Sequence, residues 1–317
     1  MHEFSRGKRA VFSRKIITVL FTVFFFLCLF SGYQNAFANG IPALVETQWL
    51  AENLKKPEIS LAYVASMVQD DKANFDKKHI TGSVYLDIGS LMGALGDGGA
   101  VPDKAKFESL MGNLGISNDT HVVIYGAGGG NPFIATAFWL MKYNGHKNVS
   151  YLNGGITKWA SENRPTTGEP AKITPAKYKA MPDESIMADA VYVLQNLKNP
   201  KVAIVDARGV EEYKGTDTTM GNKRTGHIPS AINLNFYPTN LNDDGTFKSV
   251  SDLKTAYESK GVTKDKEIIV YCQGGVRASD THFVLKYILG YPKVRNYVGS
   301  WGEWGNRLDP AKYPAEK

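Results

Sequence analysis

Short apolar runs alternate with helix-length amphipathic segments through most of the chain. The two clearest runs, at residues 202–205 and 268–271, are continuously apolar and are bounded by polar residues. Such runs are typical of strands that are buried on both faces of a parallel sheet. Strands that alternate with helices are joined by right-handed crossovers, which place the helices over the sheet. The pattern therefore predicts an α/β fold with mainly parallel sheets flanked by helices.

The hydrophobic pattern and several sequence landmarks occur twice. The matching segments keep the same order in both halves: residues 79–86 with 227–234, 121–125 with 267–271, and 154–159 with 299–304. An offset of roughly 146 residues is too long for a solenoid repeat and indicates a duplicated domain. Between the halves, residues 165–182 contain four prolines and few large apolar residues, which indicates a linker. We expect one domain at residues 39–164 and a second at residues 183–317.

The first 38 residues have the composition of a secretory signal peptide. Five basic residues precede a fifteen-residue apolar stretch at residues 16–30, and Ala36-Phe37-Ala38 follows as a small-residue cleavage site. The stretch is shorter than the about 20 residues that span a bilayer comfortably. We expect cleavage after Ala38 and a periplasmic or secreted protein without stable membrane association. An uncleaved membrane anchor is the alternative.

The charge balance gives no sign of a polyanionic partner. The chain has 37 Lys and Arg against 31 Asp and Glu, and removal of the signal peptide leaves 32 against 30, a net charge of +2. A nearly neutral chain without a dense basic run lacks the electrostatic footprint of nucleic-acid or anionic-membrane binding. We therefore expect a small-molecule substrate and no nucleic-acid partner.

The strongest candidate for chemistry is Cys272, which directly follows the apolar run at 268–271. The next residues are Gln273-Gly274-Gly275-Val276-Arg277, and an amphipathic helix pattern begins at once. Consecutive glycines let backbone N–H groups turn inward, and with a helix N-terminus they favour a negative charge at the centre of the turn. A helix N-terminus and a nearby arginine both favour the thiolate, which is the nucleophilic form of cysteine. Cys272 is therefore the predicted nucleophile.

Other roles for Cys272 fit the sequence less well. A purely structural core cysteine needs neither the glycines nor the arginine. A cysteine protease needs a histidine base, and the nearest in sequence, His282, falls too far along the predicted helix. A disulfide oxidoreductase or a metal site needs further cysteines or spaced ligands, and the other cysteine, Cys28, lies in the predicted signal peptide. Sulfur transfer and phosphate-ester hydrolysis remain, because both use a Cys-loop-Arg turn at a helix N-terminus.

The first half has no nucleophile at the equivalent position. Gly126 matches Cys272 and begins the run Gly-Ala-Gly-Gly-Gly-Asn at residues 126–131. This run is a poor dinucleotide fingerprint, because Asn131 replaces the third glycine and no acidic residue follows at a distance of about 20 residues. We expect a catalytically silent scaffold that supplies one wall of an interdomain cleft. A partner-binding module is the alternative.

Together these features resemble the rhodanese sulfurtransferases. The similar segments are the turn at 272–277, Asp206-Ala207-Arg208 after its strand, the Gly-His-Ile-Pro turn at 226–229 and residues 298–304. In that family the active loop has six residues, as it does here, whereas related phosphatases have one more. The resemblance implies two rhodanese-like domains and a ping-pong reaction, in which Cys272 takes the outer sulfur of thiosulfate, releases sulfite, and passes the sulfur to cyanide or a thiol. It implies no metal and no organic cofactor, because the cysteine persulfide carries the sulfur.

The resemblance also implies roles for individual residues. Backbone amides of the loop would stabilise the charge of the persulfide; they belong to Gln273, Gly274, Gly275, Val276 and Arg277. The guanidinium of Arg277 closes the loop and suits the anionic end of the donor. Asp206 and Arg208 resemble a supporting pair beside the loop, and we expect Arg208 to be structural.

Two departures from the family pattern bear on the donor. Some relatives have an arginine where Glu212 stands and a lysine within the loop, and neither cation is present. The loop also differs from the Cys-Gly-Ser-Gly-Val-Thr of mercaptopyruvate-type members at Gln273 and Arg277. We expect thiosulfate as donor, with 3-mercaptopyruvate as the alternative. The second hypothesis is a non-enzymatic persulfide carrier in an exported pathway, and a protein sulfur acceptor is compatible with both.

Overall fold

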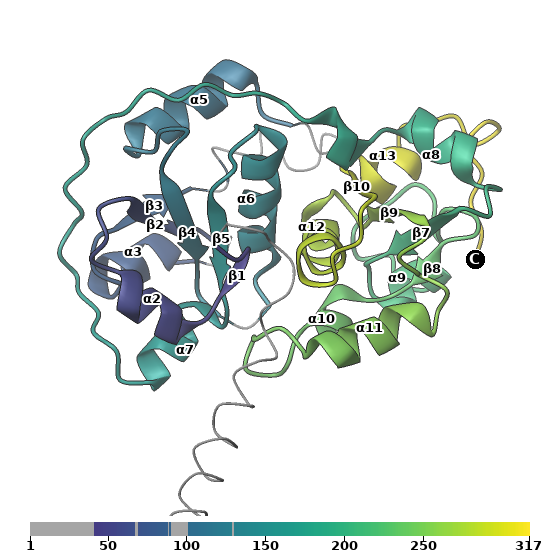
Figure 1. Ribbon diagram of the computed structural model, residues 1–317. Coiled ribbons are helices and arrows are strands. Elements are labelled where there is room, and N and C mark those ends of the chain that lie inside the picture. Colours follow the sequence, from purple (N-terminus) through teal and green to yellow (C-terminus); the bar gives the residue numbers. More distant parts are fainter. Residues whose placement is uncertain (1–40, 67–68, 88, 90–100, 129) are drawn as a thin grey trace, which may run out of the picture. The chain divides into compact units, whose positions relative to one another are not determined.

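The computed structural model describes residues 41–66, 69–87, 89, 101–128 and 130–317. Each half of this region contains one sheet of five parallel strands, flanked by helices, which confirms the predicted fold class (Figure 1). The predicted signal peptide at 1–38, including Cys28, lies outside the described residues. No helix in the described ranges is long and apolar enough to cross a membrane.

The first sheet has the strand order β1-β5-β4-β2-β3. Its strands are β1 (Leu44–Val45), β2 (Ile59–Val64), β3 (Ser83–Leu86), β4 (His121–Tyr125) and β5 (Val149–Leu152). The helices described in this half are α2 (Thr47–Asn53), α3 (Asp71–Lys77), α5 (Lys104–Asn113), α6 (Pro132–Tyr143) and α7 (Gly155–Ser161).

The second sheet repeats this order as β6-β10-β9-β7-β8. Its strands are β6 (Met187–Ala188), β7 (Val202–Asp206), β8 (Ile232–Asn233), β9 (Glu267–Tyr271) and β10 (Val294–Tyr297). The helices are a 3₁₀ turn (Glu184–Ile186), α8 (Ala190–Asn196), α9 (Val210–Lys214), α10 (Phe236–Asn240), α11 (Val250–Glu258), α12 (Val276–Phe283), a π-helical continuation of α12 (Val284–Ile288), and α13 (Ser300–Trp304).

Short polar side chains begin several of the helices. The side chain of Asn131 accepts a hydrogen bond from the amide of Phe133 at 3.0 Å, and Pro132 occupies the first turn of α6. Both residues are favoured at a helix start, because they satisfy or remove otherwise unpaired N–H groups. The asparagine that interrupts the glycine run is thus a helix cap. Asp103 caps α5 and Ser249 caps α11 in the same way.

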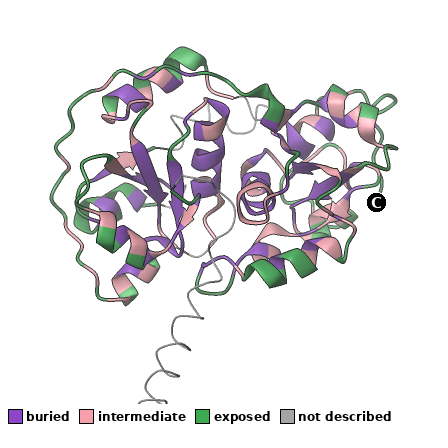
Figure 2. Ribbon diagram, in the orientation of Figure 1, coloured by how far each residue is buried: buried purple, intermediate pink, exposed green. Residues whose placement is uncertain are grey.

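One hydrophobic core continues from the first half into the second. Helices α6 and α12 pack against each other, and both are largely buried (Figures 1 and 2). The rings of Phe138 on α6 and Phe283 on α12 meet edge to face with centroids 4.8 Å apart. Tyr151 meets Phe247 in the same manner at 5.3 Å. The predicted scaffold therefore buries the apolar face of the helix that follows Cys272.

Residues 165–182, the predicted linker, run as extended chain along the outside of the first half (Figure 1). Backbone hydrogen bonds attach this segment to the first half, including a β-bridge between Thr167 and His79 and a bond from the Ala176 amide to the Gly112 carbonyl. The segment is therefore held along its length. Its exact boundaries stay a prediction.

The duplication extends to individual contacts. The amide of Ile80 donates to the Tyr125 hydroxyl at 3.0 Å, and the amide of Ile228 donates to the Tyr271 hydroxyl at 3.1 Å. His79 and His227 also pair in the same way, each through both its N–H and its carbonyl, His79 to Thr167 and His227 to Glu316. His227 thus has a structural role in its domain.

Candidate active site

Cys272 lies at the carboxyl end of β9, the central strand of the second sheet. It follows the last residue of β9 and is separated from the start of α12 by three residues. Ligands of open parallel sheets bind beyond this edge. The residue is 1% exposed and has no disulfide partner in the described part of the chain. The sulfur therefore lies below the molecular surface.

Ser300, at the start of α13, holds the backbone of the active loop. Its hydroxyl accepts hydrogen bonds from the amides of Cys272 at 3.1 Å and Gly275 at 3.0 Å, and donates to the Tyr297 carbonyl at 2.7 Å. This corrects the expectation for one amide, because the N–H of Gly275 points to Ser300 and not to an extra sulfur. A buried hydroxyl that accepts two amides fixes the turn, since buried N–H groups without an acceptor are costly.

The remaining amides of the loop keep the predicted role available. Those of Gln273, Gly274, Val276 and Arg277 have no hydrogen-bond acceptor within the described residues. All four residues are half-buried. They can therefore donate to a bound anion or to a persulfide.

The two glycines of the loop meet different requirements. Gly275 has φ +82°, and a Cβ there would lie 3.1 Å from the backbone of Val298. A left-handed conformation and a close neighbour both exclude larger residues. A Cβ on Gly274 would meet nothing within 4 Å. The two glycines look alike in sequence, but only Gly275 is required by the backbone conformation.

Gln273 is held by an amide pair at the edge of the loop. Its side chain accepts from Asn222 at 3.1 Å and donates to Asn222 at 2.7 Å, and Asn306 also donates to Asn222 at 2.8 Å. Asn222 lies 51 residues from Gln273 in sequence, and no local pattern points to this contact. The side chain of Gln273 is thus fixed by Asn222. The part of Gln273 that was predicted to stabilise the persulfide is its backbone N–H.

Arg277 forms a bidentate ion pair with Glu212. The distances are 2.5 Å from Nη1 to Oε2 and 2.8 Å from Nη2 to Oε1. Burial alone would lower the pKa of Arg277, but the bond to Glu212 and the nearby Cys272 sulfur raise it above its usual range. Burial would raise the pKa of Glu212, and the bond to Arg277 lowers it instead. The guanidinium of Arg277, which was predicted to bind the anionic end of the donor, therefore already binds a carboxylate of the protein.

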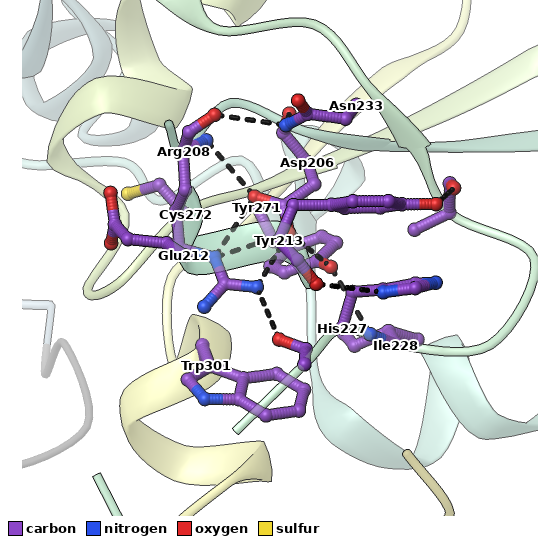
Figure 3. Close-up of polar contacts among 12 residues, drawn as sticks. Asp206, Arg208, Glu212, Tyr213, His227, Ile228, Asn233, Tyr271, Cys272 and Trp301 are labelled. Atoms are coloured by element: carbon purple, nitrogen blue, oxygen red, sulfur yellow. Dashed lines mark hydrogen bonds and ion pairs between the residues drawn. The ribbon is translucent and has the colours of Figure 1, made fainter. Parts of the chain in front are cut away.

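Asp206 and Arg208 form a second, fully buried pair (Figure 3). The guanidinium of Arg208 donates to both carboxylate oxygens of Asp206, at 3.0 Å and 2.6 Å, and to the Gly226 carbonyl at 2.8 Å. It also stacks against the ring of Trp301, with its carbon 4.8 Å from the ring centroid. Asp206 accepts from the Tyr271 hydroxyl at 2.6 Å as well. These contacts of Arg208 are all to buried groups of its own domain and none is to the active loop, which supports the structural role expected for it.

Among its described residues, the first half has no counterpart of Cys272 or of the buried Asp206–Arg208 pair. The strand registers place Tyr63 opposite Tyr125, as Asp206 is placed opposite Tyr271. Gly126 then occupies the position that Cys272 has in the second half. In the described residues, the first half thus keeps the strand arrangement and the tyrosine contact and lacks the thiol and the buried Asp–Arg pair.

Sequence reasoning missed Ser300 and Asn222 as supports of the loop. For Ser300 a signal exists, because the duplication aligns it with Gly155, so that a hydroxyl stands only in the half that has the cysteine. Within the described ranges, no cluster of three His, Cys, Asp or Glu side chains is placed to hold a metal ion.

Comparison with known proteins identifies the family of both halves. The model of the rhodanese-like domain matches residues 46–162 and again residues 189–307. A relative from Thermus thermophilus, named sulfur carrier protein TtuD, is 43% identical over 273 residues, which cover 83% of this chain and 93% of the relative. The thiosulfate sulfurtransferase of Rattus norvegicus is 33% identical, covering 84% of this chain and 93% of its own length.

A solved structure agrees with the sequence relatives. SseA from Escherichia coli, named as a 3-mercaptopyruvate sulfotransferase, superposes with a TM-score of 0.71 at 28% identity, covering 82% of this chain and 99% of SseA. The chain therefore belongs to the rhodanese family and carries two rhodanese-like domains in tandem.

Proposed function

We propose that this protein is a sulfurtransferase that moves the outer sulfur of thiosulfate to a thiophilic acceptor through a persulfide on Cys272. The observation that carries the proposal is the placement of the Cys272 thiol between the end of β9 and the start of α12, beside four loop amides that have no acceptor among the residues the structure describes. The names of the rat and Thermus relatives support sulfur transfer as the activity.

The reaction would proceed in two displacements at sulfur. The Cys272 thiolate attacks the outer sulfur of thiosulfate, and the S–S bond of the donor breaks with its electron pair leaving on sulfite. The amides of Gln273, Gly274, Val276 and Arg277 then donate to the terminal sulfur of the persulfide, whose negative charge they stabilise. Cyanide or a thiol attacks that sulfur in turn and regenerates the thiolate. Because Cys272 is 1% exposed, half-buried side chains of the loop must shift for the donor to reach it.

The test is turnover with thiosulfate and cyanide. Purified protein should form thiocyanate, and Cys272→Ser should abolish its formation while leaving the circular dichroism spectrum unchanged. Thiocyanate formed by Cys272→Ser at the original rate would reject the proposal. Phosphate-ester hydrolysis, the remaining alternative, predicts release of phosphate from an aryl phosphate by the same preparation.

A sulfur carrier is the second candidate, favoured by the name of the Thermus relative. A carrier would accept a persulfide from a partner protein on Cys272 but would turn over free thiosulfate negligibly. The same kinetic assay, run beside labelling by a persulfidated partner, separates the two functions. Substituting 3-mercaptopyruvate for thiosulfate tests the alternative donor in the same assay.

We also propose that the protein acts outside the cytoplasm. The support is the basic, apolar and small-residue order of residues 1–38. N-terminal sequencing of the protein from its host should give Asn39 as the first residue, in the periplasmic or secreted fraction. An N-terminus upstream of Ile16 in a membrane fraction would favour the uncleaved anchor instead.

A further inference from the structure

The charged side chains beside the active loop cancel one another. Two arginines are each paired with a carboxylate, Arg208 with Asp206 and Arg277 with Glu212. A third carboxylate, Asp217, is close enough to Arg277 to interact with it electrostatically. The side chains of Arg277 and Glu212 are 23% and 14% exposed, so water screens their charges only in part. The charges of these five side chains therefore sum to neutral or negative, although the loop itself contains an arginine.

Glu212 is held in a position where its carboxylate accepts hydrogen bonds from both terminal nitrogens of Arg277. Both terminal nitrogens of the guanidinium are bonded to it, and Oε2 also accepts from the Gly209 amide at 3.1 Å. Two-pronged arginine–carboxylate bonds are among the strongest in proteins. An oxyanion of the donor that binds both terminal nitrogens of Arg277 must therefore displace the Glu212 carboxylate. The Gly209 amide, at the start of α9, holds that carboxylate in place.

We propose that Glu212 is a positioning residue that sets the charge preference of the site. By holding Arg277 in a neutral pair, it disfavours a dianion such as thiosulfate relative to singly charged or uncharged compounds that react at Cys272. The inference rests on the proposed function and adds the charge class of the favoured donor. Thiosulfate remains a substrate, but the site binds it less well than a monoanion with the same reactive sulfur.

A thiosulfonate is the matched donor for this comparison. Methanethiosulfonate gives up its outer sulfur to the Cys272 thiolate, and its S–S bond breaks with the electron pair leaving on methanesulfinate. Thiosulfate undergoes the same exchange and releases sulfite. The two donors therefore differ by one negative charge and share the reacting atoms. One unit charge at roughly 6–7 Å, in an effective dielectric of about 40, changes a rate ratio about tenfold.

Alkylation of Cys272 tests the charge preference without any sulfur transfer. Iodoacetate and iodoacetamide both form a sulfur–carbon bond with loss of iodide, and only iodoacetate carries a charge. The ratio of their rates is measured on the Cys272 peptide by mass spectrometry. Glu212→Gln, which removes the negative charge and keeps one acceptor oxygen for Arg277, should raise the iodoacetate to iodoacetamide ratio by about tenfold.

Two further variants serve as controls for this measurement. Glu212→Asp keeps the charge and should leave the ratio within about twofold of the original. Glu211→Gln removes the neighbouring exposed carboxylate, which bonds the Thr216 hydroxyl at 2.6 Å, and should also leave the ratio unchanged. An unchanged ratio in Glu212→Gln, or an equal rise in Glu211→Gln, would overturn the inference.

Donor kinetics supply the second readout. Glu212→Gln should raise kcat/KM for thiosulfate relative to that for methanethiosulfonate by the same factor, mainly through a lower KM for thiosulfate. A relative kcat/KM that does not change contradicts the inference while leaving the proposed function in place. If the unchanged protein turned over neither donor, the proposed function would fail, and the alkylation ratio would still decide the role of Glu212.

Discussion

Arg208→Ala should lower the free energy of unfolding by about 3–5 kcal/mol, because it leaves a buried carboxylate without its counter-ion. Asp206 is 0% exposed and Arg208 is 1% exposed. The change removes three side-chain contacts to Asp206 and the bond to the Gly226 carbonyl. Asp206 keeps only the Tyr271 hydroxyl and the backbone amide of residue 208 as donors. Two donors do not replace a paired charge at a fully buried position.

Urea unfolding at pH 7, followed by tryptophan fluorescence, measures this loss. Trp301 stacks on Arg208, so its emission reports on the affected region. Arg208→Lys retains the charge without the planar fork and should lose less stability than Arg208→Ala. Under conditions where it is folded, Arg208→Ala should still form the Cys272 persulfide. A loss below about 1 kcal/mol would refute the reasoning on the buried charge, and a folded variant without persulfide would refute the structural role.

Three further predictions concern the loop and the helix behind it. Gly275→Ala should lower the free energy of unfolding by about 1–2 kcal/mol, because alanine is strained in the left-handed conformation of that residue. The control Gly274→Ala should change stability little, since an added Cβ there meets nothing. Equal effects of the two changes in urea unfolding would contradict this. Ser300→Ala should leave the buried amides of Cys272 and Gly275 without an acceptor, at a cost of about 1–3 kcal/mol each. It should also slow persulfide formation on Cys272 in a stopped-flow assay. An unchanged rate would show that Ser300 does not hold the loop. Burial raises the pKa of Asp280 to about 7, against about 3.9 in the unfolded chain, so the folded state retains a proton that the unfolded state loses. The stability from this group therefore falls as the pH rises from about 4 to about 7. Asp280→Asn should remove that part of the pH dependence in unfolding midpoints, and an identical pH profile would contradict the prediction.

The architecture was predictable because it rests on local patterns. Continuous apolar runs at 202–205 and 268–271 identified the central strands β7 and β9, and the duplicated landmarks placed Gly126 opposite Cys272. Buried parallel strands need such runs, and a duplicated fold repeats them at one offset. The position of the thiol at the end of a central strand followed from the same evidence.

The contacts that hold the loop were not predictable from sequence. Glu212 lies 65 residues from Arg277, and Asn222 lies 51 residues from Gln273. Polar pairs of this kind depend on how loops from different strands converge at one edge of a sheet, and hydrophobic periodicity carries no information about them. The sequence therefore indicated that Arg277 would meet an anion, and the fold supplies that anion from the protein itself.

The mass of the Cys272 peptide after brief incubation with thiosulfate tests the central claim most directly. The account predicts an increase by one sulfur atom on this peptide, which cyanide removes with formation of thiocyanate in equal amount. A Cys272 peptide of unchanged mass, in protein that still converts thiosulfate and cyanide to thiocyanate, would contradict it.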